Sequence, residues 1–175
     1  MKLWLKNKKH FLILLVVTAT IYSQEPAITS SDQLDFWVGE WEVTWDEGEG
    51  KMGYGVNRIT KVLDGKVIQE NFEITEGQSK GYKGTSISSY HTAAKKWFQC
   101  YADNNGTFYH FVGNLNGDRK TFKTEVFTTK DGKDFTQRMV FHHITQDAMI
   151  WDWESSNDGG KTWTLNWKIN YKRKG

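Results

Sequence analysis

Cysteine and proline are almost absent from this chain of 175 residues, which contains one of each. Cys100 has no partner cysteine, so an internal disulfide is excluded and the fold has to be stabilised by its hydrophobic core. Pro26 lies near the start, so no proline removes a backbone hydrogen-bond donor from the patterned region that follows.

Long hydrophobic runs are also scarce. The only one, residues 11–17, follows four lysines and precedes a more polar stretch ending at Ser23. This order is typical of a secretory signal peptide, and the run is short for a membrane span, although an uncleaved anchor is the alternative. We therefore predict a signal peptide at 1–23, a short segment at 24–33 and a domain at 34–175. The mature chain would be periplasmic or extracellular, without a transmembrane segment.

An excess of positive charge is missing from the predicted mature chain. Without the four lysines of the leader, 19 Lys and Arg face 21 Asp and Glu, a net charge of about −2. A nearly neutral surface gives no general electrostatic reason to bind nucleic acid. The sequence carries no signal for a particular oligomeric state.

What the chain does contain is alternation with a period of two, which places successive side chains on opposite faces of a β-strand. In the last patterned segment the apolar positions are Trp163, Leu165, Trp167, Ile169 and Tyr171. The same alternation runs through residues 37–46. Both ends of the domain are therefore predicted to be strands with one buried face.

Eight further strands are predicted between these two. They lie at about residues 54–63, 66–75, 81–91, 95–103, 107–114, 119–129, 134–144 and 148–155. Asn-Gly and Asp-Gly pairs separate many of them and favour tight hairpins, so neighbouring strands should pair antiparallel. The predicted strands show no protected edges, and closing the sheet on itself pairs the backbone groups of its edge strands. We therefore predict an all-β, up-and-down barrel of about ten strands, with a two-sheet sandwich as the alternative.

One short helix is expected before the first strand. Ser30, Ser31 or Asp32 could cap a turn through residues 33–36 and so plug one end of the barrel.

Three motifs resemble known proteins. Residues 34–41, with the sequence Leu-Asp-Phe-Trp-Val-Gly-Glu-Trp, resemble the opening of calycin-like barrels, in which a short helix and a Gly-x-Trp element close the bottom. Together with residues 96–99 and 158–163, they are most similar to an exported family called domain of unknown function 1579. The resemblance implies a barrel related to lipocalins and fatty-acid-binding proteins. Haem-binding relatives use a histidine inside the barrel, often on the final strand. The final strand here has none, which leaves a pocket for a small apolar or amphipathic molecule and predicts no cofactor.

The chain is rich in aromatic residues, which either fill the core or line such a pocket. Trp151 and Trp153 share a strand face about 7 Å apart, so they could flank a planar ligand or a sugar ring, or form a packed wall. Glu70 shares a face with Ile68 and Phe72 and is predicted to point inward, where a charge needs a partner. The complete set of predicted ligand-binding residues is Glu70, Tyr90, Trp97, Gln99, Tyr101, Arg138, Phe141, Trp151, Trp153 and Trp167. An internal Glu-Arg pair with bridging water is the alternative role for the polar members.

Motifs for metal or nucleophilic chemistry are lacking. His142 and His143 are adjacent, so on a strand they are expected to point to opposite faces, and no His-x-His or Cys-His spacing of a zinc site occurs. No Gly-x-Ser-x-Gly motif is present. Residues 156–163 fit the Ser-x-Asp-x-Gly-x-x-Trp turn once, which predicts a local turn staple rather than a repeated propeller.

Three functions follow from these observations. The first is an exported barrel that binds a small hydrophobic or amphipathic molecule. The second is an enzyme that uses Glu70 as an acid or base, with Arg138 or Tyr90 stabilising charge. The third is a carbohydrate- or protein-binding module with exposed aromatic side chains. We expect a binding protein rather than an enzyme.

Overall fold

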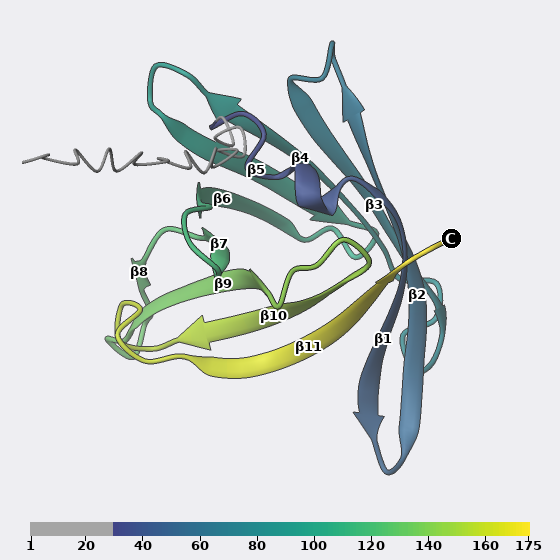
Figure 1. Ribbon diagram of the computed structural model, residues 1–175. Helices are drawn as coiled ribbons and strands as arrows, with labels where there is room; N and C mark the ends of the chain where they lie inside the picture. Colours follow the sequence, from purple (N-terminus) through teal and green to yellow (C-terminus); the bar gives the residue numbers. More distant parts are fainter. Residues whose placement is uncertain (1–29) are drawn as a thin grey trace, which may run out of the picture.

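The computed structural model describes residues 30–175 and shows an all-β protein (Figure 1). Ten antiparallel strands close into one barrel, and an eleventh, very short strand lies at its margin. The predicted signal peptide and most of the predicted segment 24–33 lie outside the described residues. No helix within residues 30–175 has both the length and the apolar character of a membrane span.

The strands follow one another round the barrel. Their bounds are β1 Gly39–Gly48, β2 Lys51–Val62, β3 Val67–Glu76, β4 Lys83–His91, β5 Lys96–Asp103, β6 Phe108–Asn114, β7 Lys120–Lys123, β8 Phe127–Thr128, β9 Asp134–His142, β10 Ala148–Ser156 and β11 Thr164–Arg173. Tight turns join neighbours as predicted. Asp64 and Gly65, for example, have φ values of 55° and 76°, the conformation that a two-residue hairpin requires.

The first and last strands complete the barrel. β1 pairs with β11, with Trp41 opposite Arg173, while β9 pairs with both β7 and β10. In Figure 1 the end of the yellow β11 meets the start of the dark blue β1. The predicted closed barrel is confirmed, and the alternative two-sheet sandwich was wrong.

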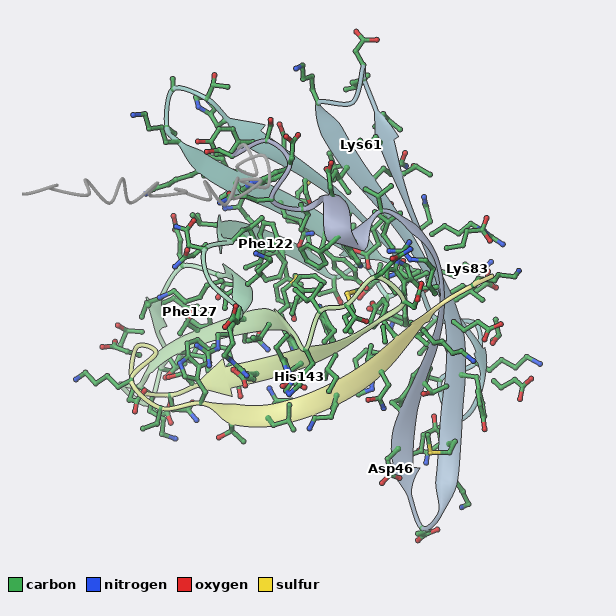
Figure 2. The ribbon with its side chains drawn as sticks, viewed as in Figure 1. Asp46, Lys61, Lys83, Phe122, Phe127 and His143 are labelled. Atoms are coloured by element: carbon green, nitrogen blue, oxygen red, sulfur yellow. The ribbon has the colours of Figure 1, made fainter. Side chains whose placement is uncertain are left out.

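One predicted strand, residues 119–129, is divided into β7 and β8. At the break, the Thr124 hydroxyl accepts a hydrogen bond from the Gln137 backbone N–H, which would otherwise bond a backbone carbonyl. A side chain thus replaces one rung of the ladder. Beyond it, β8 continues pairing with the start of β9, and its Phe127 is exposed whereas Phe122 of β7 is fully buried (Figure 2).

The last strand departs from simple alternation at a β-bulge. Trp153 lies opposite Trp167, but Glu154 lies opposite Leu165, so Asn166 is the extra residue. Leu165 therefore faces outward and is 49% exposed, which corrects its prediction as a buried residue. The pattern holds beyond the bulge, where Ile169 and Tyr171 are buried.

The predicted plug is not an α-helix. A turn leads into a single 3-10 turn at Asp35–Trp37, and no side chain caps it. The correction has a physical reason, because the backbone N–H groups of Trp37 and Val38 bond carbonyls three residues back, which gives a 3-10 turn, and Leu34 and Trp37 anchor this turn by burial. The Phe36 and Trp37 rings pack edge-on against Phe141, with centroid distances of 5.6 and 5.2 Å.

Candidate functional site

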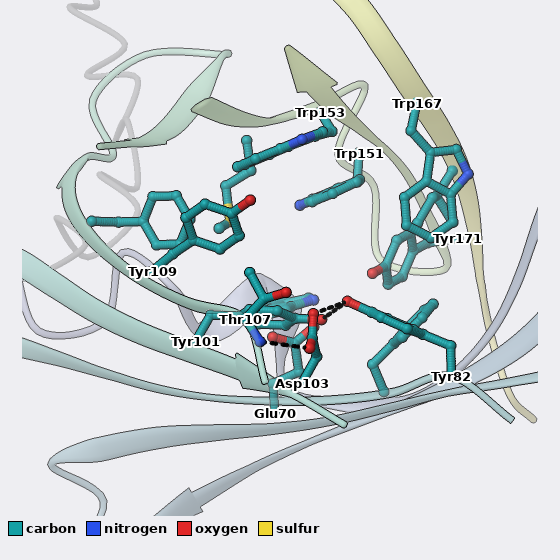
Figure 3. A pocket seen from close by; sticks show the side chains of 15 residues that line it. Glu70, Tyr82, Tyr101, Asp103, Thr107, Tyr109, Trp151, Trp153, Trp167 and Tyr171 are labelled. Carbon is teal, nitrogen blue, oxygen red and sulfur yellow. Dashed lines mark hydrogen bonds between the residues drawn. The ribbon is translucent and has the colours of Figure 1, made fainter. Parts of the chain in front are cut away.

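A cavity of about 200 Å³ lies inside the barrel (Figure 3). Its walls are mainly aromatic and come from strands all round the barrel together with the 3-10 turn. The lining residues are Trp37, Glu70, Phe72, Tyr82, Tyr101, Asp103, Thr107, Tyr109, Phe111, Met139, Trp151, Trp153, Trp167, Ile169 and Tyr171. Five of the ten predicted site residues are among them: Glu70, Tyr101, Trp151, Trp153 and Trp167.

Three tryptophans form one wall of the cavity. Trp151 and Trp153, two residues apart on β10, have planes only 4° from parallel and centroids 6.2 Å apart. Trp167 on β11 meets Trp151 edge-on at 5.9 Å. A ring inserted between two parallel rings needs a separation of about 7–8 Å. The predicted sandwich of a ligand between Trp151 and Trp153 is therefore wrong, and the pair offers its faces and edges as a wall.

Glu70 is the buried acid of the cavity. Strand alternation on β3 turns it inward, as predicted, and residues of the neighbouring strands hold both of its carboxyl oxygens. Asn57 Nδ2 donates to Oε1 at 2.7 Å, and Ser86 Oγ donates to Oε2 at 2.6 Å. Gln99, also buried, donates from Nε2 to Ser88 Oγ at 2.8 Å and to Ser86 Oγ at 3.3 Å. Gln99 therefore lies behind the cavity wall and orients a hydroxyl rather than contacting the space itself.

Burial raises the pKa of Glu70 above its ordinary value of 4.5, even though its two hydrogen bonds act in the opposite direction. The Asn57 amide also donates to the Tyr171 hydroxyl at 3.0 Å, and burial raises the pKa of that phenol. Glu70 is therefore an acid that takes up a proton readily at the end of an apolar space.

A second acid, Asp103, lies on the cavity lining beside the β5–β6 turn. Its Oδ2 accepts from the Tyr82 hydroxyl at 3.0 Å, and its Oδ1 accepts from the Thr107 backbone N–H at 3.0 Å. The Tyr101 hydroxyl in turn contacts that of Tyr82. Desolvation opposes ionisation of Asp103, but these donors together lower its pKa. Burial raises the pKa of Tyr82 to about 12, so both tyrosines keep their protons at neutral pH.

Several predicted residues lie at the 3-10 turn instead of the cavity. Trp97 is buried and donates from Nε1 to the Ser30 carbonyl at 3.0 Å. Tyr90 packs against the Trp97 ring with a centroid distance of 5.9 Å. Phe141 is fully buried beneath the turn. These aromatic residues fill the barrel end, which corrects their placement on the cavity lining.

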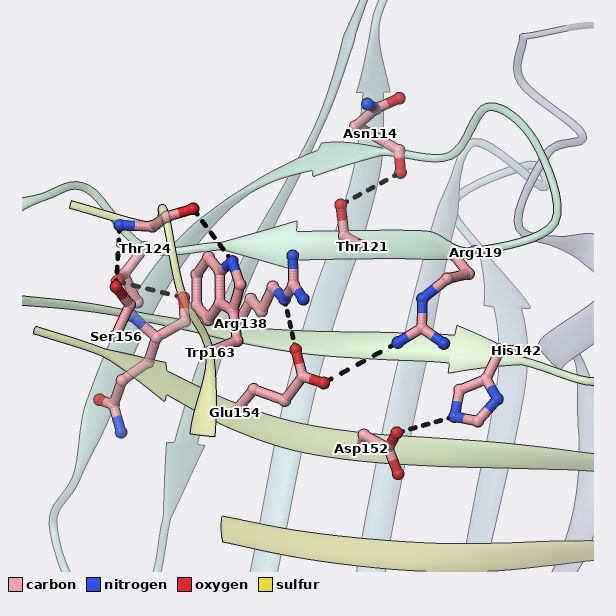
Figure 4. A network of polar contacts seen from close by, with 12 residues as sticks. Asn114, Arg119, Thr121, Thr124, Arg138, His142, Asp152, Glu154, Ser156 and Trp163 are labelled. Atoms are coloured by element: carbon pink, nitrogen blue, oxygen red, sulfur yellow. Dashed lines mark hydrogen bonds and ion pairs between the residues drawn. The ribbon is translucent and has the colours of Figure 1, made fainter. Parts of the chain in front are cut away.

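Arg138 faces out of the barrel (Figure 4). Its neighbour Met139 lines the cavity, so alternation turns Arg138 to the other face, where it pairs with Glu154 of β10 and lies 3.9 Å from the centre of the Trp163 ring. Glu154 also faces Arg119 at 3.8 Å. Neither the predicted cavity position of Arg138 nor an internal pair with Glu70 is present.

The same outer face corrects the prediction for the adjacent histidines. His143 has a positive φ of 50° and leaves the strand, so its Nδ1 comes within 2.6 Å of His142 Nδ1. His142 Nε2 contacts Asp152 Oδ2 at 2.8 Å. Within residues 30–175, no group of three or more His, Cys, Asp or Glu side chains is arranged to hold a metal ion.

The predicted turn staple at residues 156–163 is confirmed. Asp158 Oδ1 accepts from the Ser156 hydroxyl at 2.7 Å and from the Lys161 backbone N–H at 2.9 Å. Trp163 Nε1 donates to the Gly160 carbonyl at 3.1 Å. The turn thus holds the Trp163 ring against Arg138 on the outer face of the barrel and does not present the ring as a binding surface.

No tryptophan of the described chain is exposed. The exposed aromatic side chains are Tyr54, Phe108 and Phe127, each on a different strand. The cluster of exposed indoles expected for a surface-binding module is thus not found among residues 30–175.

Asn57, Tyr82, Asp103 and Tyr171 are site residues that sequence reasoning missed. Asn57 and Tyr171 were open to prediction, because each is a polar or amphipathic residue at an inward position of its strand. Tyr82 and Asp103 lie near the ends of the predicted strands 81–91 and 95–103, in step with the inward residues Ser86 and Tyr101, so alternation indicates an inward position for them as well.

No protein-family model matches the chain, and no curated protein matches it either. The function is therefore inferred from the cavity itself.

Proposed function

We propose that the protein binds a small apolar or amphipathic molecule inside the barrel. The observation that carries this proposal is the cavity of about 200 Å³ with aromatic walls and few polar groups. An apolar cavity of about 150 Å³ accommodates benzene, so this one suits a ligand with one ring and a short substituent. A long fatty acyl chain does not match that volume.

Native mass spectrometry of the protein purified gently from its own host tests the proposal. We expect an added small-molecule mass that is lost on denaturation. Replacing Thr107, which lines the cavity beside Asp103, by tryptophan should remove the added mass by filling the space. The matched control is Thr164→Trp, because Thr164 is exposed at the start of β11. Equal retention by Thr107→Trp, or no added mass even after incubation with small aromatic cations, alcohols and acids, would contradict the proposal.

An enzymatic role for the same cavity is the second candidate, because a buried carboxyl group with a raised pKa is a common general acid or base. The cavity lining contains no Lys, Arg or His to stabilise a developing negative charge, which favours binding over catalysis. Equal turnover of a panel of small esters by the wild type and Glu70→Gln would exclude a role for Glu70.

The assignments to a family and a compartment are further proposals. The barrel is compatible with the calycin-like fold implied by residues 34–41, and membership of the family called domain of unknown function 1579 is supported by the three sequence motifs. Export to the periplasm or the extracellular space is supported by the order of basic, apolar and polar residues in 1–23.

A further inference from the structure

We propose that the cavity selects a positively charged ligand: a small organic ammonium ion attached to an aromatic or compact apolar body. This inference rests on the binding function proposed above and names the chemical class that the site would take. It is carried by the charges and aromatic faces of the lining, one step at a time.

The charged groups of the lining are all acidic. Glu70 lies at the buried end and Asp103 beside the β5–β6 turn, while no Lys, Arg or His side chain contributes to the wall. The donors around each carboxyl group come from the protein, and among residues 30–175 no Lys, Arg or His side chain forms an ion pair with either acid. An anionic ligand would place its charge near the ionised Asp103 and would oppose ionisation of Glu70, which costs free energy because like charges repel strongly at low dielectric. A cation would instead supply the missing opposite charge.

The aromatic faces of the cavity are likewise free of the protein's own cations. The described part of the chain has three cation–π contacts, in which Lys120 faces Phe36, Arg138 faces Trp163 and Arg173 faces Trp41. None of these six residues lines the cavity. Within residues 30–175, the indoles of Trp151, Trp153 and Trp167 therefore carry no competing cation, and the negative face of an indole attracts an ammonium ion.

The hydrogen bonds of the cavity point the same way. The Tyr82 hydroxyl donates to Asp103 and the Ser86 hydroxyl donates to Glu70, so the oxygens of the two carboxyl groups are the acceptors that remain for a ligand. An ammonium group has only donors to offer and suits such a site. The indole N–H of Trp37 is a buried donor on the lining without a partner. Neutral donors of this kind do not offset two acidic groups, and they can bond a hydroxyl elsewhere on the ligand.

Binding of a cation should release a proton from Glu70. Around its carboxyl group lie Asn57 and Ser86, which do not titrate, and the Tyr82, Tyr101 and Tyr171 hydroxyls, whose pKa values are all raised. The pKa of Asp103 is lowered, so Asp103 is already ionised at neutral pH. Glu70 is thus the group of the cavity that changes charge when an ammonium ion arrives.

Three probes of matched shape test the inference by isothermal titration calorimetry: 2-phenylethylamine, which is cationic at neutral pH, the neutral 2-phenylethanol and the anionic 3-phenylpropanoate. We expect the amine to bind at least tenfold more tightly than the alcohol, and the acid not to bind measurably. Repeating the amine titration in buffers of different ionisation enthalpy should reveal protons released to the buffer. Glu70→Gln should reduce the affinity for the amine at least tenfold, and by a larger factor than it reduces the affinity for the alcohol.

The outcomes separate the two proposals. If none of the three probes binds, the binding function itself is contradicted. If the alcohol or the acid binds as tightly as the amine, the cavity binds ligands without selecting a cation and this inference is overturned. Should Glu70→Gln fail to fold, the proton release of the wild type decides: amine binding without released protons at any pH between 5 and 8 overturns the role of Glu70.

Discussion

Glu70 shows how a single side chain can be placed by local rules and tuned by its surroundings. Glu70 shares a strand face with Ile68 and Phe72, so its side chain points into the barrel. Hydrogen-bond donors from two neighbouring strands hold it there. Burial of Glu70 disfavours the charged form of the acid. The free-energy cost of burying the Glu70 carboxyl group should therefore appear in the stability of the protein.

We expect Glu70→Gln to change how stability depends on pH. The pKa of Glu70 is raised in the folded state, so the folded protein binds the proton more tightly than the unfolded chain does. The free energy of unfolding should therefore fall as pH rises from about 4.5 through the raised pKa, by up to ~1.4 kcal/mol per pH unit for this one group. Glu70→Gln should lack this contribution, so its stability relative to the wild type should increase across that range. Denaturant unfolding at several pH values measures the difference.

Glu73→Gln is the matched control, because Glu73 lies on the same strand but faces outward, 3.2 Å from Lys83. Its stability should follow that of the wild type with pH. Parallel curves for Glu70→Gln and the wild type would show that the acid pays no penalty for its burial.

At the scale of the elements, the period of two predicted most of the barrel. Nine of the strands lie where alternation and turn residues placed them, because inward and outward positions differ so clearly in polarity. The features that escaped prediction depend on register between strands. The Asn166 bulge reverses Leu165, and the pairing of β9 with β10 sets Arg138 opposite Glu154. Neither can be read from one strand alone.

The site was half predictable for the same reason. Alternation identified inward residues that line the cavity, namely Glu70, Tyr101, Trp151, Trp153 and Trp167. It could not distinguish inward residues that line the cavity from inward residues that pack at the end of the barrel. Trp97 and Phe141 also point inward, yet they meet the 3-10 turn, and only the depth of each residue along the barrel separates the two groups.

Gly84 on β4 leaves space for the side chain of Tyr101, which is on the neighbouring strand β5 and lines the cavity. A Cβ atom on Gly84 would lie 2.1 Å from the hydroxyl oxygen of Tyr101. We expect Gly84→Ala to lower the free energy of unfolding by ~1–3 kcal/mol, because the Tyr101 ring has to move within a packed interior. Chemical denaturation measures this loss.

A double-mutant cycle with Tyr101→Ala provides the check on that explanation. If the clash with Tyr101 is the cause, Gly84→Ala should cost clearly less when the ring has been removed. The same cost in both backgrounds would assign the effect to the strand backbone instead.

For the whole molecule, Arg173 joins the 3-10 turn to the closing strands. Its guanidinium donates from Nη1 to the Val38 carbonyl at 2.8 Å and from Nη2 to the Phe36 carbonyl at 3.2 Å, and it lies 4.1 Å from the centre of the Trp41 ring. Gly39, with φ of 137°, leaves the space that the guanidinium occupies. One side chain thus fastens the barrel end to the last strand.

We expect Arg173→Lys to lower the free energy of unfolding by ~1–3 kcal/mol, because an ammonium group keeps the charge but cannot make the divergent hydrogen bonds or the planar stack. Thermal and denaturant unfolding measure the loss. Lys174→Ala is the control, since Lys174 is exposed and 4.0 Å from Glu40, and its stability should stay within about 0.5 kcal/mol of the wild type. A loss of equal size in both variants would show that the effect is not particular to the hydrogen bonds and stacking of the Arg173 guanidinium.

The seam between β1 and β11 also governs how the binding site comes into being. It brings together residues as far apart in the chain as Val38 and Arg173, separated by 135 positions. Contacts of such long sequence range fold slowly, because the chain loses much entropy before they form. The cavity is lined by residues of both the 3-10 turn and the last strand, so it cannot form before the whole domain has been synthesised. Biosynthesis has to deliver the final residues before Trp37 has a cavity to line.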